Sequence, residues 1–124
     1  MAKVAATEFS KAVVGVCSES KAVRTWDVKI FEDSVARIRI FLVDSSFIDV
    51  YYNAETKKVS FAWIINNKRA YGTDNLGGWH IHPVGRPDIH SASAEVDFRE
   101  FLTNIEQKIG ASSRDRNKNP PGDN

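Results

Sequence analysis

The sequence predicts an α+β fold, in which a five- or six-stranded antiparallel β meander packs against an N-terminal and a C-terminal helix. Apolar and polar residues alternate through the middle of the chain, short polar turns separate these runs, and both ends carry apolar residues at helical spacing. Loops this short join antiparallel neighbours, because a parallel crossover needs about a dozen residues or more. We therefore expect one domain over residues 1–110 and a disordered tail over residues 111–124.

The N-terminal helix is predicted from one apolar stripe, which comprises Phe9, Ala12, Val13, Val16 and Cys17. Thr7 is its expected cap, and the helix should end near residues 18–20. Cys17 is the only cysteine of the chain, so no internal disulfide can form. We interpret it as a small core residue.

Five runs predict the strands of the meander, at residues 26–31, 35–43, 47–52, 59–65 and 69–71. Polar residues suited to turns separate them. Arg37 and Arg39 fall on the polar face of the second run. With Lys68, Arg69 and an exposed Tyr51 or Tyr71, they offer a candidate RNA-binding surface.

The C-terminal helix is predicted from the stripe Phe98, Phe101, Leu102, Ile105 and Ile109. Ser93 is its expected cap, and Glu95 and Asp97 would lie in the first turn, where carboxylates suit the positive end of the helix dipole. Gly110 is expected to end the helix.

The composition excludes several classes of protein. With 42% hydrophobic and 27% charged residues, the chain is not disordered throughout. Its net charge of +1 gives no overall attraction to nucleic acid, so RNA binding would need a local basic patch. No run of about 18 apolar residues predicts a transmembrane helix, and the first residues do not resemble a signal peptide. We expect a cytoplasmic protein without membrane contact.

All three histidines of the chain lie within residues 80–90. His80 and His82 are two positions apart, so an extended segment would project both imidazoles from the same face. Gly77 and Gly78 precede them and would let the backbone approach a substrate closely. Asp74 and Asn75 would orient an imidazole or form the turn itself.

Three interpretations of the histidine pair stay open. In a metal-free site one histidine is the general base on a ribose 2′-hydroxyl and another the general acid, with Arg86 or Arg69 holding the phosphate. In a metal site His80 and His82 bind a divalent ion such as Zn²⁺ with His90, Asp74 or Asp88. In the third interpretation the histidines only fill a surface. We favour the metal-free site, because the sequence shows no carboxylate cluster as compact as the histidine pair.

The segment from about residue 42 to residue 105 resembles the TumE-like family of small prokaryotic toxins. The resemblance rests on the run LVDSSFIDV at residues 42–50, a second hairpin, Asp74-Asn75 leading into His80-Ile81-His82-Pro83, and a closing helix. It implies the toxin of a toxin–antitoxin pair, with a cognate antitoxin protein as partner.

Together the residues and the resemblance predict an RNA endonuclease that needs no cofactor. The expected catalytic residues are His80, His82, Asp74 and Asn75, and the expected substrate-binding residues are Arg86, Arg69, Gly77 and Gly78. A non-catalytic module that binds RNA or protein, and a metal-dependent hydrolase or nuclease that uses the same histidines, are the alternatives.

Overall fold

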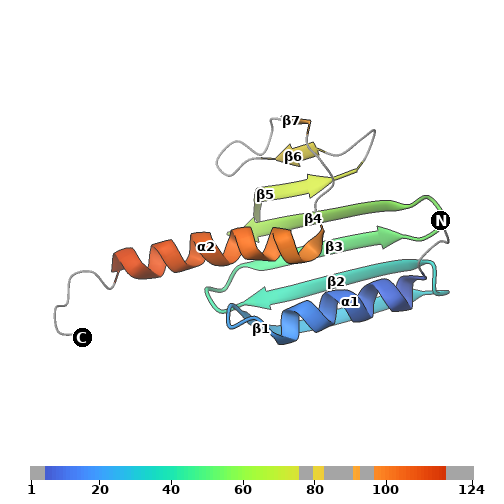
Figure 1. Cartoon of the computed structure of the whole chain (residues 1–124), viewed down its shortest axis with the longest axis horizontal. Coiled ribbons are helices and arrows are strands. Elements are labelled where there is room, and N and C mark those ends of the chain that lie inside the picture. Colours follow the sequence, from blue (N-terminus) through green and yellow to red (C-terminus); the bar gives the residue numbers. More distant parts are fainter. Residues whose placement is uncertain (1–4, 76–79, 83–90, 93–96, 117–124) are drawn as a thin grey trace.

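A computed structural model describes residues 5–75, 80–82, 91–92 and 97–116, and of residues 80–82, 91–92 and 111–116 the backbone alone. Within these ranges the chain forms one antiparallel sheet with a helix before it and a helix after it (Figure 1). Both helices, α1 (Ala6–Ser18) and α2 (Phe98–Arg116), lie on the same face of the sheet and contact each other. The predicted α+β meander with a helix at each end is confirmed.

Among the described residues seven strands follow one another in chain order across the sheet, each antiparallel to the next. Five are long and the last two are short: β1 (Val23–Phe31), β2 (Val35–Leu42), β3 (Phe47–Asn53), β4 (Lys58–Ile65), β5 (Lys68–Asp74), β6 (His80–His82) and β7 (Ser91–Ala92). Tight turns explain this order. Asn66 and Asn67 both have positive φ between β4 and β5, a conformation that asparagine tolerates better than most residues.

The core lies between the sheet and the two helices. From α2 it receives Phe98, Phe101, Leu102 and Ile105, with Ile109 packed at its margin, so the predicted stripe is confirmed. Phe101 is fully buried and stacks on Tyr71 of β5, with the ring centroids 5.1 Å apart. Neither helix, over its described length, has an apolar stretch long enough to cross a membrane.

The buried stripe of α1 differs in part from the prediction. Val13 and Cys17 are buried as expected, but Ala12 is exposed and Ser10 takes a core position. The stripe is therefore centred on Ala6, Ser10, Val13 and Cys17, a spacing that also follows the helical period. Burial raises the pKa of the Cys17 thiol to about 12, which keeps it protonated and unreactive.

The N-terminus of α1 is capped from outside the helix. The predicted cap, Thr7, lies inside the helix, and Asp33 from the β1–β2 turn takes the capping role. Its carboxylate accepts a hydrogen bond from the Thr7 backbone N–H at 2.8 Å and another from the Thr7 hydroxyl at 2.6 Å. The Asp33 carbonyl also accepts from the Ala6 N–H at 3.1 Å. These bonds satisfy donors that a helix start leaves unpaired.

The limits of α2 also correct the prediction. The helix begins at Phe98, and Asp97 is its cap, with Oδ1 accepting from the Glu100 N–H at 2.8 Å. Ser93 lies outside the described residues. The backbone stays helical past Gly110 to Arg116, because a glycine costs only about 1 kcal/mol inside a helix and no proline follows before that point. The expected end at Gly110 is therefore wrong.

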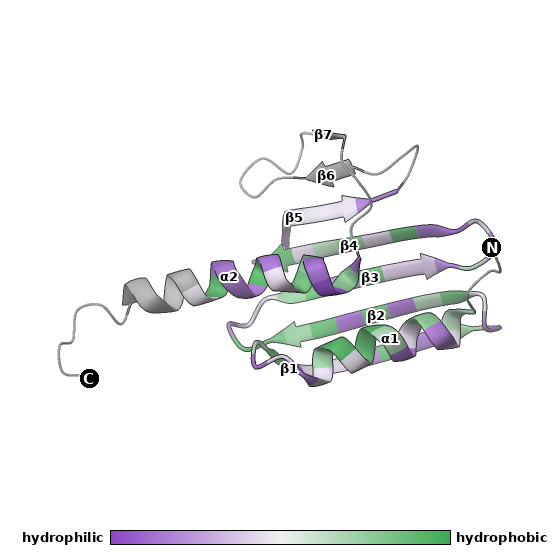
Figure 2. Cartoon of the chain, viewed as in Figure 1, coloured by the Kyte–Doolittle hydropathy of each residue, from purple (hydrophilic) through white to green (hydrophobic). Residues whose placement is uncertain are grey.

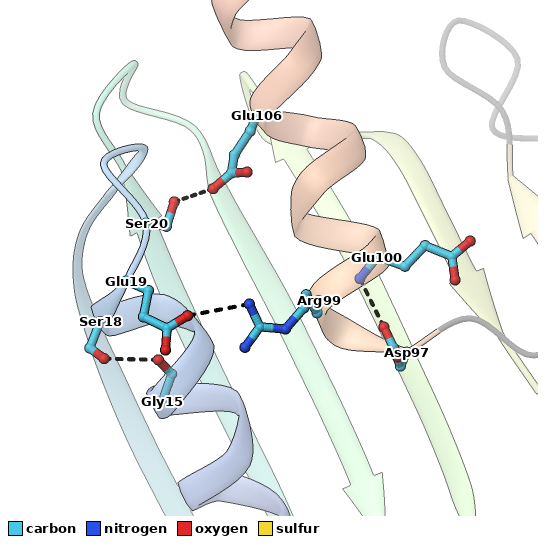
Figure 3. Close-up of polar contacts among 8 residues, drawn as sticks. All are labelled: Gly15, Ser18, Glu19, Ser20, Asp97, Arg99, Glu100 and Glu106. Atoms are coloured by element: carbon cyan, nitrogen blue, oxygen red, sulfur yellow. Dashed lines mark hydrogen bonds and ion pairs between the residues drawn. The ribbon is translucent and has the colours of Figure 1, made fainter.

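Polar contacts join the end of α1 to α2 (Figure 3). Arg99 Nη1 lies 3.3 Å from Glu19 Oε1 in an exposed ion pair, and the Ser20 hydroxyl donates to Glu106 Oε2 at 2.5 Å. The exposed pair contributes little stability. The contacts still fix where the chain leaves α1 and enters β1.

The turn between β2 and β3 is held by a buried tryptophan. Trp63 Nε1 donates to the Ser46 hydroxyl at 2.8 Å, and that hydroxyl donates to Asp44 Oδ1 at 2.5 Å. Ser46 is itself buried. A buried indole N–H needs an acceptor. Ser46 and Asp44 of the LVDSSFIDV run therefore have a structural role, because they provide and orient that acceptor.

Candidate nucleic-acid interface

The helices cover only one face of the sheet, and we call the opposite face the open face. The strand registers align two rows of residues across it. One row contains Lys29, Arg37, Tyr51, Ser60, Asp74 and His80, and the other contains Asp27, Arg39, Asp49, Ala62, Gly72 and His82. The colouring of β2 in Figure 2 alternates between hydrophobic and hydrophilic bands, as expected for a strand with a core side and an open side.

The open face is hollowed. A depression of about 680 Å³ extends over β1 to β5, and its charged lining consists of four cations and two carboxylates: Lys29, Arg37, Arg39, Arg69, Asp27 and Asp49. The lining is therefore positive, although the whole chain is nearly neutral. A concave surface with excess positive charge attracts polyanions.

Two of the arginines stack on aromatic rings. Arg39 lies 4.2 Å from the centroid of Phe47 and forms a two-pronged ion pair with Asp49, at 2.8 Å and 3.0 Å. Arg37 lies over Tyr51, with 5.3 Å between the guanidinium carbon and the ring centroid. In the described part of the chain, Arg37, Lys29 and Arg69 form no ion pair. Their charges are available to a ligand.

A bulge in β5 decides which side chains reach the open face. Ile64 pairs with Arg69, but Trp63 pairs with Tyr71, so Ala70 is an extra residue between them. The extra residue reverses the alternation. Arg69 therefore lines the open face, whereas Tyr71 is buried against α2 and its hydroxyl accepts from Asn104 Nδ2 at 3.1 Å. Two tyrosines were candidates for RNA binding. The prediction of an exposed Tyr71 is wrong, because Tyr71 is buried on the helix side of the sheet, whereas Tyr51 lies on the open face.

Gly72 leaves space beside Arg69. A Cβ atom at Gly72 would lie 3.5 Å from Arg69 Cδ and only 3.0 Å from the Phe61 carbonyl oxygen. The arginine stem thus passes over the glycine backbone. In the register Gly72 lies opposite His82 of β6.

The predicted residues Asp74 and Asn75 lie at the end of β5. Asp74 is half-buried and lies between Ser60 of β4 and His80 of β6 in the register. The Asn75 side chain binds backbone: Oδ1 accepts from the Val59 N–H at 2.9 Å, and Nδ2 donates to the Lys57 carbonyl at 2.8 Å. Asn75 thus fastens the end of β5 to the start of β4.

The structure describes the backbone of His80 and His82. Both lie in β6, His80 opposite Asp74 and His82 opposite Gly72. The other predicted site residues, Gly77, Gly78, Arg86 and His90, lie outside the described residues. Asp88, the alternative metal ligand, also lies outside them.

Four polar residues of the open face were not predicted from the sequence: Asp27, Lys29, Asp49 and Ser60. The signal was present, since Asp27 and Lys29 alternate with Trp26 and Val28, and Asp49 lies between Ile48 and Val50. The alternation alone does not predict the register that aligns these residues across neighbouring strands.

The family model for Toxin TumE matches residues 14–109. The chain belongs to this family. The TumE match begins within α1, includes all strands of the sheet and ends within α2, so the open face and the histidine strand both lie inside it. Membership identifies the chain as a toxin component. No curated protein and no solved structure matches the chain.

Proposed function

We propose that this TumE-family toxin cleaves RNA on the open face, with His80 and His82 as general acid and general base. One observation carries the proposal: the strand register brings the His-x-His strand to the end of the two rows, on the same open face as Lys29, Arg37 and Arg69, which form no ion pair among the described residues. Residues two apart in a strand share a face. An RNA strand held along the rows would therefore pass both imidazoles.

The proposed reaction needs only proton transfers. One imidazole takes the proton of a ribose 2′-hydroxyl, and the 2′-oxygen forms a bond to the adjacent phosphorus. The bond from phosphorus to the 5′-oxygen breaks, and the second imidazolium donates its proton to that leaving oxygen. The products are a 2′,3′-cyclic phosphate and a free 5′-hydroxyl. Histidine suits both roles because its ordinary pKa lies near neutrality.

The neighbouring residues have supporting roles in the proposal. Arg69 would hold the phosphate beside His82, and Arg86, Gly77 and Gly78 stay proposed as further substrate-binding residues. Asp74 would orient His80, which it faces in the register. Asn75 acts as a positioning residue, because its hydrogen bonds to β4 fix the end of the strand that carries Asp74.

The open face also suggests how the RNA strand is bound. Arg37 and Arg39 lie over aromatic rings and keep planar groups at the surface, which suits stacking with unpaired bases as well as phosphate contacts. We therefore propose single-stranded RNA as the substrate. The toxin family implies a cognate antitoxin protein as partner, and we propose that the antitoxin blocks this face in the cytoplasm.

The test compares three variants with the wild type in cleavage and salt-titrated binding of a single-stranded RNA. His82→Ala should abolish cleavage and keep RNA affinity, because an acid–base group acts mainly in the transition state. Arg37→Ala should weaken binding and reduce the magnitude of the salt slope by about 0.7, the contribution of one phosphate contact in a single strand. Lys11→Ala on α1 is the matched control, since it removes an exposed cation from another element.

Three other results would each change the assignment. If neither the wild type nor any variant binds or cuts RNA at low salt, the ribonuclease proposal fails. Binding without cleavage would indicate the non-catalytic module. Loss of cleavage in excess chelator, with recovery on adding Zn²⁺ or Mn²⁺, would indicate that a metal bound by the histidines carries the reaction.

A further inference from the structure

The outer edge of β1 is a second distinctive surface of the chain. β1 is the first strand in the order of the sheet, and no described strand pairs with its outer side. It is also long, at nine residues, and it carries two of the large apolar side chains that remain exposed: Ile30 at 38% and Phe31 at 51%. An unpaired edge of this length is a template for pairing with another strand.

The backbone groups at this edge can be assigned from the hydrogen bonds of the sheet. The Leu42 N–H bonds to the Ser46 carbonyl across the β2–β3 turn, so even-numbered residues of β2 direct their N–H and C=O groups toward β3. Odd-numbered residues of β2 then bond to their β1 partners, which are the odd-numbered residues 25 to 31. The N–H and C=O groups of Trp26, Val28 and Ile30 therefore point outward from the sheet.

We propose that two copies of this chain pair through β1 in an antiparallel arrangement whose two-fold axis passes through Val28. In this register Val28 meets its own copy, and Trp26 meets Ile30 of the second copy. All three residues present outward backbone groups, so the pairs can exchange hydrogen bonds. The proposal does not depend on the reaction proposed for the histidines.

The side chains of β1 are complementary in this register. Asp27 lies opposite Lys29 of the second copy, and the symmetry repeats the pair, so two opposite-charge pairs form on the open face. On the helix side Trp26 meets Ile30, which covers part of an exposed apolar side chain. Phe31 would lie opposite Thr25.

The neighbouring registers lack this complementarity. An axis through residue 27 places the two copies of Asp27 opposite each other, and an axis through residue 29 does the same with Lys29. Like charges directly opposite one another are destabilising. A charged edge usually discourages pairing, but here the alternation of Asp27 and Lys29 selects one self-pairing register. Pairing would join the two open faces into one continuous surface, with a histidine strand near each end.

The decisive experiment is a charge swap, read by the mass in solution from light scattering. The wild type should have twice the mass of one chain, and Lys29→Asp should dissociate it, because four carboxylates then meet at the interface. The double variant Asp27→Lys with Lys29→Asp restores two opposite-charge pairs and should restore the dimer. Lys58→Asp, at an exposed strand position away from the edge, is the control and should stay dimeric.

Amide hydrogen exchange gives an independent readout on the same proteins. The amides of Trp26, Val28 and Ile30 should be protected in the wild type and in the double variant, and should exchange rapidly in Lys29→Asp. A wild type with the mass of one chain at about 100 µM overturns the proposal. So does a dimer that Lys29→Asp leaves intact. Protection of the same three amides only when an antitoxin is bound would assign the edge to the antitoxin and equally overturn it.

Discussion

Replacing Asn75 by alanine tests whether this residue acts through the fold. In the structure its amide accepts from the Val59 N–H at 2.9 Å and donates to the Lys57 carbonyl at 2.8 Å. Asn75→Ala removes both bonds and leaves the first residues of β4 without these partners. The histidine strand pairs with β5, so a loosened β4–β5 connection also loosens the proposed site.

The expected loss of stability follows from the two contacts. One hydrogen bond contributes about 0.5–1.5 kcal/mol, and the bond to Val59 is part-buried whereas the bond to Lys57 is exposed. We therefore expect a loss of about 1–2 kcal/mol. For a chain of 124 residues the unfolding entropy at the midpoint is about 0.26 kcal/mol/K, so the melting temperature should fall by about 4–8 °C.

Thermal unfolding followed by circular dichroism measures this shift, and Asn75→Asp is the comparison variant. The aspartate keeps an acceptor for the Val59 N–H but turns a carboxylate oxygen toward the Lys57 carbonyl, so it loses the donor. RNA cleavage is measured in parallel, well below both melting temperatures. If Asn75→Ala melts within about 1 °C of the wild type, the two hydrogen bonds do not fasten β5 to β4 and the positioning role is refuted.

Three further predictions concern the fold. Phe101→Ala should lower the unfolding free energy by about 3–5 kcal/mol, because the ring is fully buried between Tyr71 and Phe61, and a urea titration measures this; a loss below about 1 kcal/mol would contradict the described core. The hydrogen bonds from Thr7 hold the pKa of Asp33 below its ordinary value, so the stabilisation it provides is present above about pH 4 and is lost as the pH falls through the folded pKa. The stability difference between wild type and Asp33→Asn should therefore shrink on acidification, and a constant difference from pH 7 to acid would refute the cap. Cys17 should react with a thiol reagent only after unfolding, since it is 1% exposed and its pKa is raised to about 12, and rapid labelling of the native protein would disprove that burial.

The sequence was sufficient for the five long strands and for the stripe of α2, because period-two and helical patterns report burial directly. Tyr71 shows where the pattern stops being sufficient. Its assignment to a face depends on the extra residue Ala70, and a bulge depends on how β4 pairs with β5. The charged rows of the open face depend on strand pairing in the same way. The sequence therefore predicted the histidines as candidate residues but only some of the cations on the open face.

The helix ends show a second limit. Thr7 looked like a cap because local chemistry favours it, but Asp33 lies 26 residues away in the sequence and no local pattern connects the two. At α2 the better signal was local: Asp97 is followed three residues later by Glu100, the spacing of a capping box. Gly110 does not end α2, since glycine weakens a helix without ending it.

The capping of α1 by Asp33 has a consequence for synthesis on the ribosome. The segment of α1 is translated before β1 and β2, but its first turn has no side-chain acceptor of its own for its free N–H groups. A helix of 13 residues is marginal in water without tertiary support. Helix α1 can therefore become stable only after the β1–β2 hairpin has left the ribosomal tunnel and closed its turn, so α1 folds after a hairpin that is synthesised later than it.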